Sequence, residues 1–276
     1  MKIILLSLAI LISLNLQSSA DTLYNKVIKE GKIKCGYYVT PPYFNKDPNN
    51  GSLSGIWYEY VEEIGKRLDL EIEWSLEVGL GDLTEALKSG KIDAYCAGLW
   101  NNPSRSKHID FVTPISYQIL YPFVRDNDNR FDSNLEKVNN NNIIVSCIDG
   151  EMADLIAKSD FPKAKRSCLP QLSPYSDILT NISNGKADIT FASPSLVEAF
   201  NANNPDKKLK QVKTENPIRI FPESLALNYG EHDFRRMLDH TTRFLINSGF
   251  INNVLKKYEG EYGSFYIVKE PYKDKH

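Results

Sequence analysis

The chain has 276 residues, of which 42% are hydrophobic and 25% are charged. Its 33 lysine and arginine residues face 35 acidic residues, and the formal net charge of −2 at pH 7 is ordinary for a soluble domain. This balance gives no support to nucleic-acid binding, which needs a basic surface. The length is enough for one large domain or two small ones, each with its own core.

Residues 1–20 have the composition of a secretory signal peptide. Lys2 gives a minimal basic start, and the apolar run IILLSLAILISLNL after it is too short to span a bilayer comfortably. Ser18 and Ala20 are the small residues that a signal peptidase reads. No cysteine follows the run, and no later segment reads as membrane-spanning. We therefore expect a soluble, exported mature chain without a lipid anchor.

The first half of the chain predicts strands that alternate with helices. The segment IKCGYYV, residues 33–39, is a predicted strand that ends at the turn TPPYF. In WYEYVEEIGKRL, residues 57–68, apolar side chains recur at helical spacing, and LEIEWSL, residues 70–76, follows as a strand.

Two segments in different halves of the chain share one plan. LTEALKSGKIDAYCAGL, residues 83–99, and SDILTNISNGKADITFAS, residues 176–193, each begin as a helix, pass through Gly-Lys-x-Asp and continue as a strand. Gly90 and Gly185 mark the two helix ends. A helix that returns to a strand is the second half of a βαβ unit. The repetition therefore predicts two lobes of similar α/β architecture.

The remaining segments of the second half complete this alternation. We predict strands at residues 142–150 and 163–170, a helix at 151–159, and two helices within 232–258 that are broken near Ser248 and Gly249. The polar segment 124–142 is expected to be an exposed connection.

The four cysteines allow three pairings, and an exported chain permits disulfides. Cys35 and Cys96 lie in strand-like runs of the first half, and Cys147 and Cys168 in such runs of the second. One bridge within each half is favoured. The alternative is four buried free thiols.

A short polar turn separates two apolar runs in CAGLWNNPSRSKHIDFVTPI, residues 96–115. In α/β lobes, ligands gather at the carboxyl ends of strands, where this turn lies. Asn102 or Ser104 is a candidate cap for a short helix that starts near Pro103. Helix amides and the forked guanidinium of Arg105 would then face one cleft and suit a carboxylate. The alternative is a surface arginine paired with Asp110.

The order of these elements resembles the periplasmic solute-binding proteins of the polar amino-acid type, family 3 of the extracellular solute-binding proteins, which serve ABC importers. The pattern runs across nearly all of the mature chain, from IKCGYY to FLINSGFINNVLKKY. Its most specific part is the set Arg105, Ile109, Asp110, Phe111, Thr113 and Pro114.

The resemblance implies an α/β fold with two Rossmann-like lobes joined by two crossing strands, the type II periplasmic binding protein fold. Lobe 1 would consist of residues 21–119 and 224–276, and lobe 2 of residues 120–223. The two lobes would close on a solute, and the C-terminal helices would complete lobe 1.

The resemblance also implies roles for residues of lobe 1. Arg105 matches the family arginine that holds the α-carboxylate of the ligand. Tyr38 and Thr40 lie on the first turn, where the family contacts the ligand's side chain. Gly98 and Trp100 stand where small or hydroxyl residues usually touch the ligand, so Trp100 departs from the pattern. Asn102, likewise, stands where a threonine is usual.

In lobe 2 the sequence departs from the family pattern at the residues that would bind the α-ammonium group of the ligand. Asp149-Gly150-Glu151 begins a helix at the place of the family's Gly-Thr contact, and Ser193 stands where an aspartate usually binds the α-ammonium group. Either Asp149 or Glu151 supplies the missing negative charge, or the ligand has no ordinary α-ammonium group. A third interpretation is that both acids only complement the helix dipole.

Aromatic residues gather near the predicted strand ends and predict a partly aromatic cleft for a flat or cationic ligand. They are Trp57, Trp100, Tyr37, Tyr38 and Tyr43. The ligand-binding residues predicted from these patterns together are Arg105, Trp100, Tyr38, Thr40, Trp57, Gly98, Asn102, Glu151 and Ser193.

The expected function is capture of a small polar solute, an amino acid or a related carboxylate, in the periplasm by a monomer that delivers it to the membrane subunits of an ABC importer. The alternatives are a sensor that presents its ligand to a membrane receptor and a dehydratase-like enzyme with Glu151 as general acid. The four histidines lack metal-ligand spacing, and no nucleophile or nucleotide-binding motif occurs. We therefore expect no catalytic residue, metal or cofactor, and no nucleic-acid partner.

Overall fold

The computed structural model describes residues 22–41, 43–103, 105–132, 134–259 and 265–267. The predicted signal peptide, residues 1–20, and Ser104 lie outside the described residues. Among the described helices, none combines the length and apolar character needed to cross a membrane.

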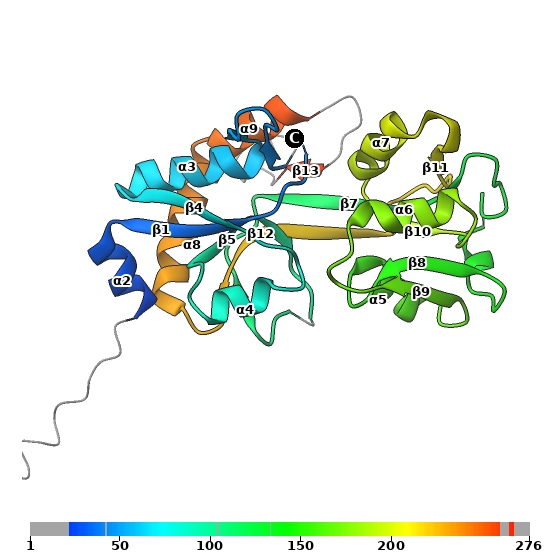
Figure 1. Ribbon diagram of the computed structural model, residues 1–276, viewed down its shortest axis with the longest axis horizontal. Helices are drawn as coiled ribbons and strands as arrows, with labels where there is room; N and C mark the ends of the chain where they lie inside the picture. The colour runs from blue at the N-terminus through cyan, green and yellow to red at the C-terminus, as the bar shows by residue number, and fades with distance from the viewer. Residues whose placement is uncertain (1–21, 42, 104, 133, 260–264, 268–276) are drawn as a thin grey trace, which may run out of the picture.

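Figure 1 shows two lobes side by side, with two long strands running from one lobe into the other. These strands are β7 (Ser116–Arg125) and β12 (Arg219–Asn228). They pair antiparallel, with Glu223 opposite Ser116 and Arg219 opposite Leu120. The expected pair of crossing strands is therefore present.

The first lobe is built on a mainly parallel sheet whose order is β4-β1-β5-β12. Its elements are α2 (Leu23–Glu30), β1 (Lys32–Tyr37), β2 (Asn45–Lys46), β3 (Leu53–Ser54), α3 (Ile56–Leu68), β4 (Glu71–Glu77), α4 (Leu83–Lys88), β5 (Ala94–Trp100), β6 (Ile109–Phe111), α8 (His232–Asn247), α9 (Phe250–Tyr258) and β13 (Phe265–Ile267). The apolar face predicted for residues 57–68 is the buried face of α3, which packs against α8 and α9.

The second lobe repeats the strand–helix alternation on a smaller scale. Its elements are η1 (Leu135–Val138), β8 (Ile144–Ile148), α5 (Met152–Asp160), β9 (Lys165–Leu169), α6 (Tyr175–Ser183), β10 (Thr190–Ala192), α7 (Pro194–Asn203), η2 (Pro205–Lys207) and β11 (Leu209–Gln211). β8 and β9 pair in parallel, while β10 and β11 each pair with β7.

Each lobe contains one disulfide between neighbouring segments of its sheet. Cys35 on β1 bonds to Cys96 on β5, with an S–S distance of 2.10 Å, and Cys147 on β8 bonds to Cys168 on β9, with 1.98 Å. This is the pairing that the sequence favoured over free thiols.

Both predicted helix–strand repeats are confirmed as α4 with β5 and α6 with β10. The break between the C-terminal helices is confirmed at Gly249, whose φ is 79°. The prediction of an exposed connection over residues 124–142 was wrong in part. β7 continues to Arg125, and Phe131 and Val138 are buried in the second lobe because the polar chain folds back onto that lobe.

The buried side chains separate into cores that match the two lobes. One cluster combines residues 27–115 with residues 225–255, and the two other clusters combine residues between 120 and 212. On this basis we propose lobe 1 as residues 21–119 and 224–276, and lobe 2 as residues 120–223.

Candidate ligand-binding site

A cavity of about 310 Å³ lies between the lobes, a volume at the small end of the range for small-molecule sites. Its polar and aromatic lining residues are Tyr38, Thr40, Tyr43, Tyr95, Trp100, Arg105, Gln118, Glu151, Tyr175, Ser176, Ser193, Ser195 and Glu223. Because these residues come from both lobes, relative motion of the lobes would open or close the cavity.

Arg105 is held at the cavity by the turn that follows β5. The Asn102 side-chain oxygen accepts a hydrogen bond from the Arg105 backbone N–H at 3.0 Å, and Arg105 Nη1 donates to the Trp100 carbonyl at 3.3 Å. The residues after Asn102 form hydrogen-bonded turns and not the helix predicted near Pro103, because β6 begins already at Ile109. The guanidinium therefore faces the cavity from a short, capped turn.

Arg105 forms an ion pair with Glu151 across the gap between the lobes. Arg105 Nη2 donates to Glu151 Oε1, and the two side chains are 11% and 4% exposed. The alternative partner, Asp110, instead accepts from the backbone N–H of Gly230 at 3.0 Å. Burial raises the pKa of Glu151, and the positive charge of Arg105 partly offsets that effect.

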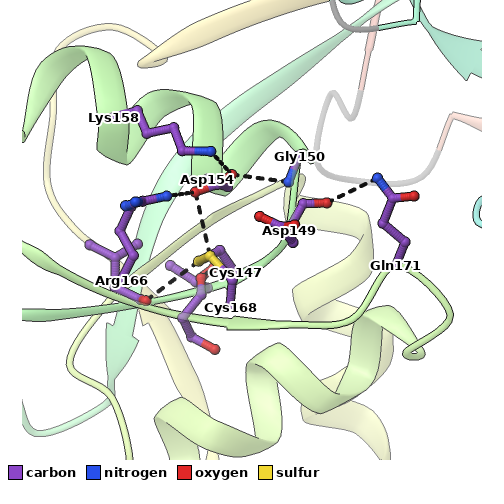
Figure 2. The surroundings of a disulfide bond; sticks show 11 residues. Cys147, Asp149, Gly150, Asp154, Lys158, Arg166, Cys168 and Gln171 are labelled. Atoms are coloured by element: carbon purple, nitrogen blue, oxygen red, sulfur yellow. Dashed lines mark hydrogen bonds and ion pairs between the residues drawn. A yellow bond between two sulfur atoms is a disulfide. The ribbon is translucent and has the colours of Figure 1, made fainter.

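Glu151 lies at the N-cap of α5, after Gly150 with its φ of 74°. The backbone N–H of Gly150 donates to the buried carboxylate of Asp154 at 3.0 Å, which ties the turn to the helix (Figure 2). The turn before α5 is therefore held in place by a side chain within the helix, and it aims Glu151 at the cavity.

Asp154 is the centre of a buried charge cluster beside the second disulfide. Lys158 Nζ and Arg166 Nη1 each donate to its carboxylate at 2.6 Å, and the sulfur of Cys168 lies 3.4 Å from Asp154 Oδ1 (Figure 2). Burial alone would raise the pKa of Asp154, but these hydrogen bonds outweigh burial and lower it. The cysteine sulfurs are bonded to each other, so this cluster has no thiolate for a metal.

A second contact joins the lobes on the other wall of the cavity. Ser193 is the N-cap of α7. Its hydroxyl lies 3.4 Å from the hydroxyl of Ser195, which in turn lies 3.2 Å from the phenol oxygen of Tyr43 in the first lobe. The lobes therefore contact each other through Arg105–Glu151 and through Tyr43–Ser195.

Several predicted site residues lie together at the cavity, and others do not. Tyr38, Thr40, Gly98, Trp100, Arg105, Glu151 and Ser193 line it. Asn102 is buried as the cap of the turn, and Tyr37 stacks on Phe44 with 5.0 Å between ring centroids. Asp149, the alternative acid, is not among the lining residues, and its carbonyl accepts from Gln171 at 3.3 Å (Figure 2).

Trp57 does not line the cavity as predicted, because its helix α3 turns it into the core of the first lobe. The side chain is fully buried and packs against Tyr60. Its indole lies directly under Gly98, whose φ is 80° and whose added Cβ would be 2.2 Å from Trp57 Cε2. Trp57 thus supports the cavity wall from behind.

Glu223 is a cavity residue that the sequence analysis missed. It lies on β12, is 4% exposed, and accepts hydrogen bonds from Gln118 Nε2 at 2.6 Å, from the Ser116 hydroxyl at 3.1 Å and from the Trp100 side chain. Burial raises the pKa of Glu223 to about 8 despite these three donors. An acid inside residues 220–227, a segment that is apolar except for Glu223 and Ser224, was the available signal.

Comparisons with known proteins agree with this architecture. The model of the family "Bacterial extracellular solute-binding proteins, family 3" matches residues 33–261. The "Probable ABC transporter extracellular-binding protein YckB" of Bacillus subtilis is 30% identical over 117 residues, which cover 41% of this chain and 40% of that protein. The "Probable histidine-binding protein" of Campylobacter jejuni is 23% identical over 216 residues, covering 77% and 79%.

The fold has close structural counterparts as well. The crystal structure of the ancestral amino acid-binding protein AncCDT-1, a precursor of cyclohexadienyl dehydratase, matches with a TM-score of 0.71 at 21% identity, covering 86% of this chain and 99% of that one. The α/β fold is that of the type II periplasmic binding proteins. With a family model matched over most of its length, this chain belongs to family 3 of the bacterial extracellular solute-binding proteins.

Proposed function

We propose that the protein captures an amino acid or a related small carboxylate between its lobes and delivers it to the membrane subunits of an ABC importer. It acts as a monomer in the periplasm after removal of residues 1–20. The observation that carries the proposal is the largely buried side chain of Arg105, which faces the interlobe cavity and pairs with a carboxylate from the opposite lobe.

A zwitterionic solute suits this ion pair because it brings one charge for each partner. The solute carboxylate takes the place of the Glu151 carboxylate on the fork of Arg105, and the solute ammonium group binds the released Glu151. Arg105 and Glu151 then each keep an opposite partner, which a buried ion needs. Glu151 thereby supplies the negative charge that Ser193 lacks.

Capture requires both lobes because each lobe contributes one of the two charges. Arg105 belongs to the first lobe and Glu151 to the second. A solute that bridges them favours the closed form by its extra contacts there. Trp100 and Tyr175, 6.4 Å apart between ring centroids, add an aromatic wall from both sides of the gap.

A thermal-shift panel of amino acids, betaines, polyamines and small carboxylates tests solute capture. A solute at a hundred times its dissociation constant should add about 2.7 kcal/mol to the free energy of unfolding. Recovery of the bound solute unchanged supports a binding protein. Its consumption during incubation supports the dehydratase-like alternative, in which the buried Glu151 acts as general acid.

Delivery needs a separate experiment in cells. Spheroplasts of the source bacterium lose their periplasmic proteins and should regain uptake of the labelled solute when the purified protein is added back. If the solute binds tightly but uptake is not restored, the sensor alternative is favoured and the importer assignment is wrong.

A further inference from the structure

The formal charges at the cavity do not balance. Among the described lining residues, the side chains that carry full charges near neutral pH when solvated are Arg105, Glu151 and Glu223. Arg105 and Glu151 offset each other as an ion pair. The hydrogen-bond partners of Glu223 in the described part of the chain are Ser116, Gln118 and Trp100, and all three are neutral. When Glu223 is ionised, it therefore has no cationic partner among the described lining residues.

The carboxylate of Glu223 is held firmly in the cavity wall. Ser116 on β7 and Trp100 on β5 are its direct register partners on the two neighbouring strands, and Gln118 lies two residues along β7. The side-chain nitrogens of Gln118 and Trp100 can donate a hydrogen bond to Glu223 but cannot accept one from it. They therefore favour the ionised form of the Glu223 carboxyl group. A carboxylate has about four acceptor sites, and three donors leave one of them for a ligand.

We propose that Glu223 forms a subsite for the side-chain cation of a basic amino acid, so that the captured solute carries a net charge of +1. This inference rests on the proposed function of the cavity. Arg105 and Glu151 bind the α-carboxylate and the α-ammonium group, and Glu223 binds the amine or guanidinium at the other end of the solute. With such a solute every charge in the cavity has an opposite partner.

Binding at this subsite is coupled to loss of a proton. Without a cation, burial raises the pKa of Glu223 to about 8, so the group is mostly protonated at neutral pH. When the cationic group of the solute arrives, the Glu223 O–H bond breaks, the proton leaves to the solvent, and the carboxylate stays beside the cation. The phenols of Tyr43 and Tyr95 also face Glu223. Burial is the main reason that the pKa of each phenol is raised, and the charge of an ionised Glu223 adds to that rise, so both phenols stay neutral.

Isothermal titration calorimetry with lysine, arginine and ornithine tests the subsite, and norleucine and glutamine serve as neutral probes of similar size. In buffers of different ionisation enthalpy at pH 7, the basic probes should release about 0.9 proton per molecule bound. Their affinity should rise about tenfold per pH unit below pH 8. Neutral probes should show neither effect.

The variant Glu223→Gln keeps the shape of the protonated side chain and should fold like the parent. We expect it to lose roughly thirtyfold or more in affinity for the basic probes at pH 8, and to lose the proton release. Glu77→Gln is the matched control because Glu77 is a half-exposed acid on β4 that pairs with Lys46 and is not among the lining residues. It should bind all probes like the parent.

The outcomes separate the subsite from the proposed function. If the parent binds norleucine and glutamine as tightly as lysine, with no proton release, the subsite is overturned and solute capture stands. If Glu223→Gln retains the proton release with basic probes, another group carries it and the subsite is likewise overturned. If no amino acid of either kind binds the parent, both the subsite and the amino-acid function are overturned.

Discussion

Substituting Gly98 by alanine should destabilise the first lobe by about 2–5 kcal/mol, as the sum of two costs. The first cost is the backbone, because φ is 80° at Gly98 and L residues adopt the left-handed region at about 1–2 kcal/mol. The second is the overlap of the new Cβ with Trp57 Cε2 at 2.2 Å. Trp57 is fully buried and has little room to move aside, so overpacking adds about 1–3 kcal/mol.

Urea unfolding followed by circular dichroism measures this cost, and Gly31→Ala is its matched control. Gly31 has a φ of 66° and nothing within 4 Å of an added Cβ, so its substitution carries the backbone cost alone. In a Trp57→Leu background the indole is gone, and Gly98→Ala should cost no more than Gly31→Ala. If the two glycine substitutions cost the same in the parent, the argument from packing against Trp57 is refuted.

Three further predictions concern charged groups of the site. Arg105→Ala should weaken solute binding by about 2–4 kcal/mol in calorimetry, because it leaves Glu151 buried without a cation; unchanged affinity would show that the carboxylate assignment is wrong. Asp154→Asn should lower the free energy of unfolding at pH 7 by roughly 2–3 kcal/mol. Folding lowers the pKa of Asp154, so the ionised carboxylate stabilises the protein above its unfolded-state pKa. This stabilisation is lost as the pH falls through the lowered pKa of the folded state. Chemical denaturation should therefore show a gap between parent and variant that narrows as the pH falls below about 4, and a gap that stays constant from pH 7 into acid would contradict this. For Glu223 the sign is opposite, because burial raises its pKa to about 8. Without solute, the parent should lose about 1.4 kcal/mol per pH unit relative to Glu223→Gln between pH 5 and pH 8, and parallel stability curves over that range would contradict it.

Local patterns were enough to predict part of the helix–strand alternation in both lobes, although α2 and α7 were not predicted. The two Gly-Lys-x-Asp repeats and the apolar face of α3 depend on residues close in sequence, and such spacing carries secondary structure directly. The polar segment after β7 was misjudged because the prediction used only its local composition. Phe131 and Val138 are buried by contacts with distant parts of the second lobe, which local composition does not reveal.

The site was only partly predictable because its contacts join distant positions. Arg105 was predicted as a ligand-binding residue from its place in a turn, and Glu151 from its place at the start of a helix. Their ion pair could not be predicted, because the two residues are 46 positions apart and lie in different lobes. Glu223 depends on partners on two other strands, including Gln118 at 105 positions away, so nothing beside it in the sequence indicates a cavity. Trp57 shows the reverse error, since an aromatic residue at helical spacing fits a core and a cleft equally well.

The first lobe draws its core from both ends of the chain, whereas the second takes its core from one continuous stretch. Because synthesis starts at the N-terminus, residues 120–212 are made before α8 and α9. The second lobe can therefore fold early, while the apolar face of α3 stays exposed until α8 and α9, which pack against this helix, have been made. Until then the incomplete first lobe exposes apolar surface, and it is the part of the new chain most prone to aggregation and proteolysis.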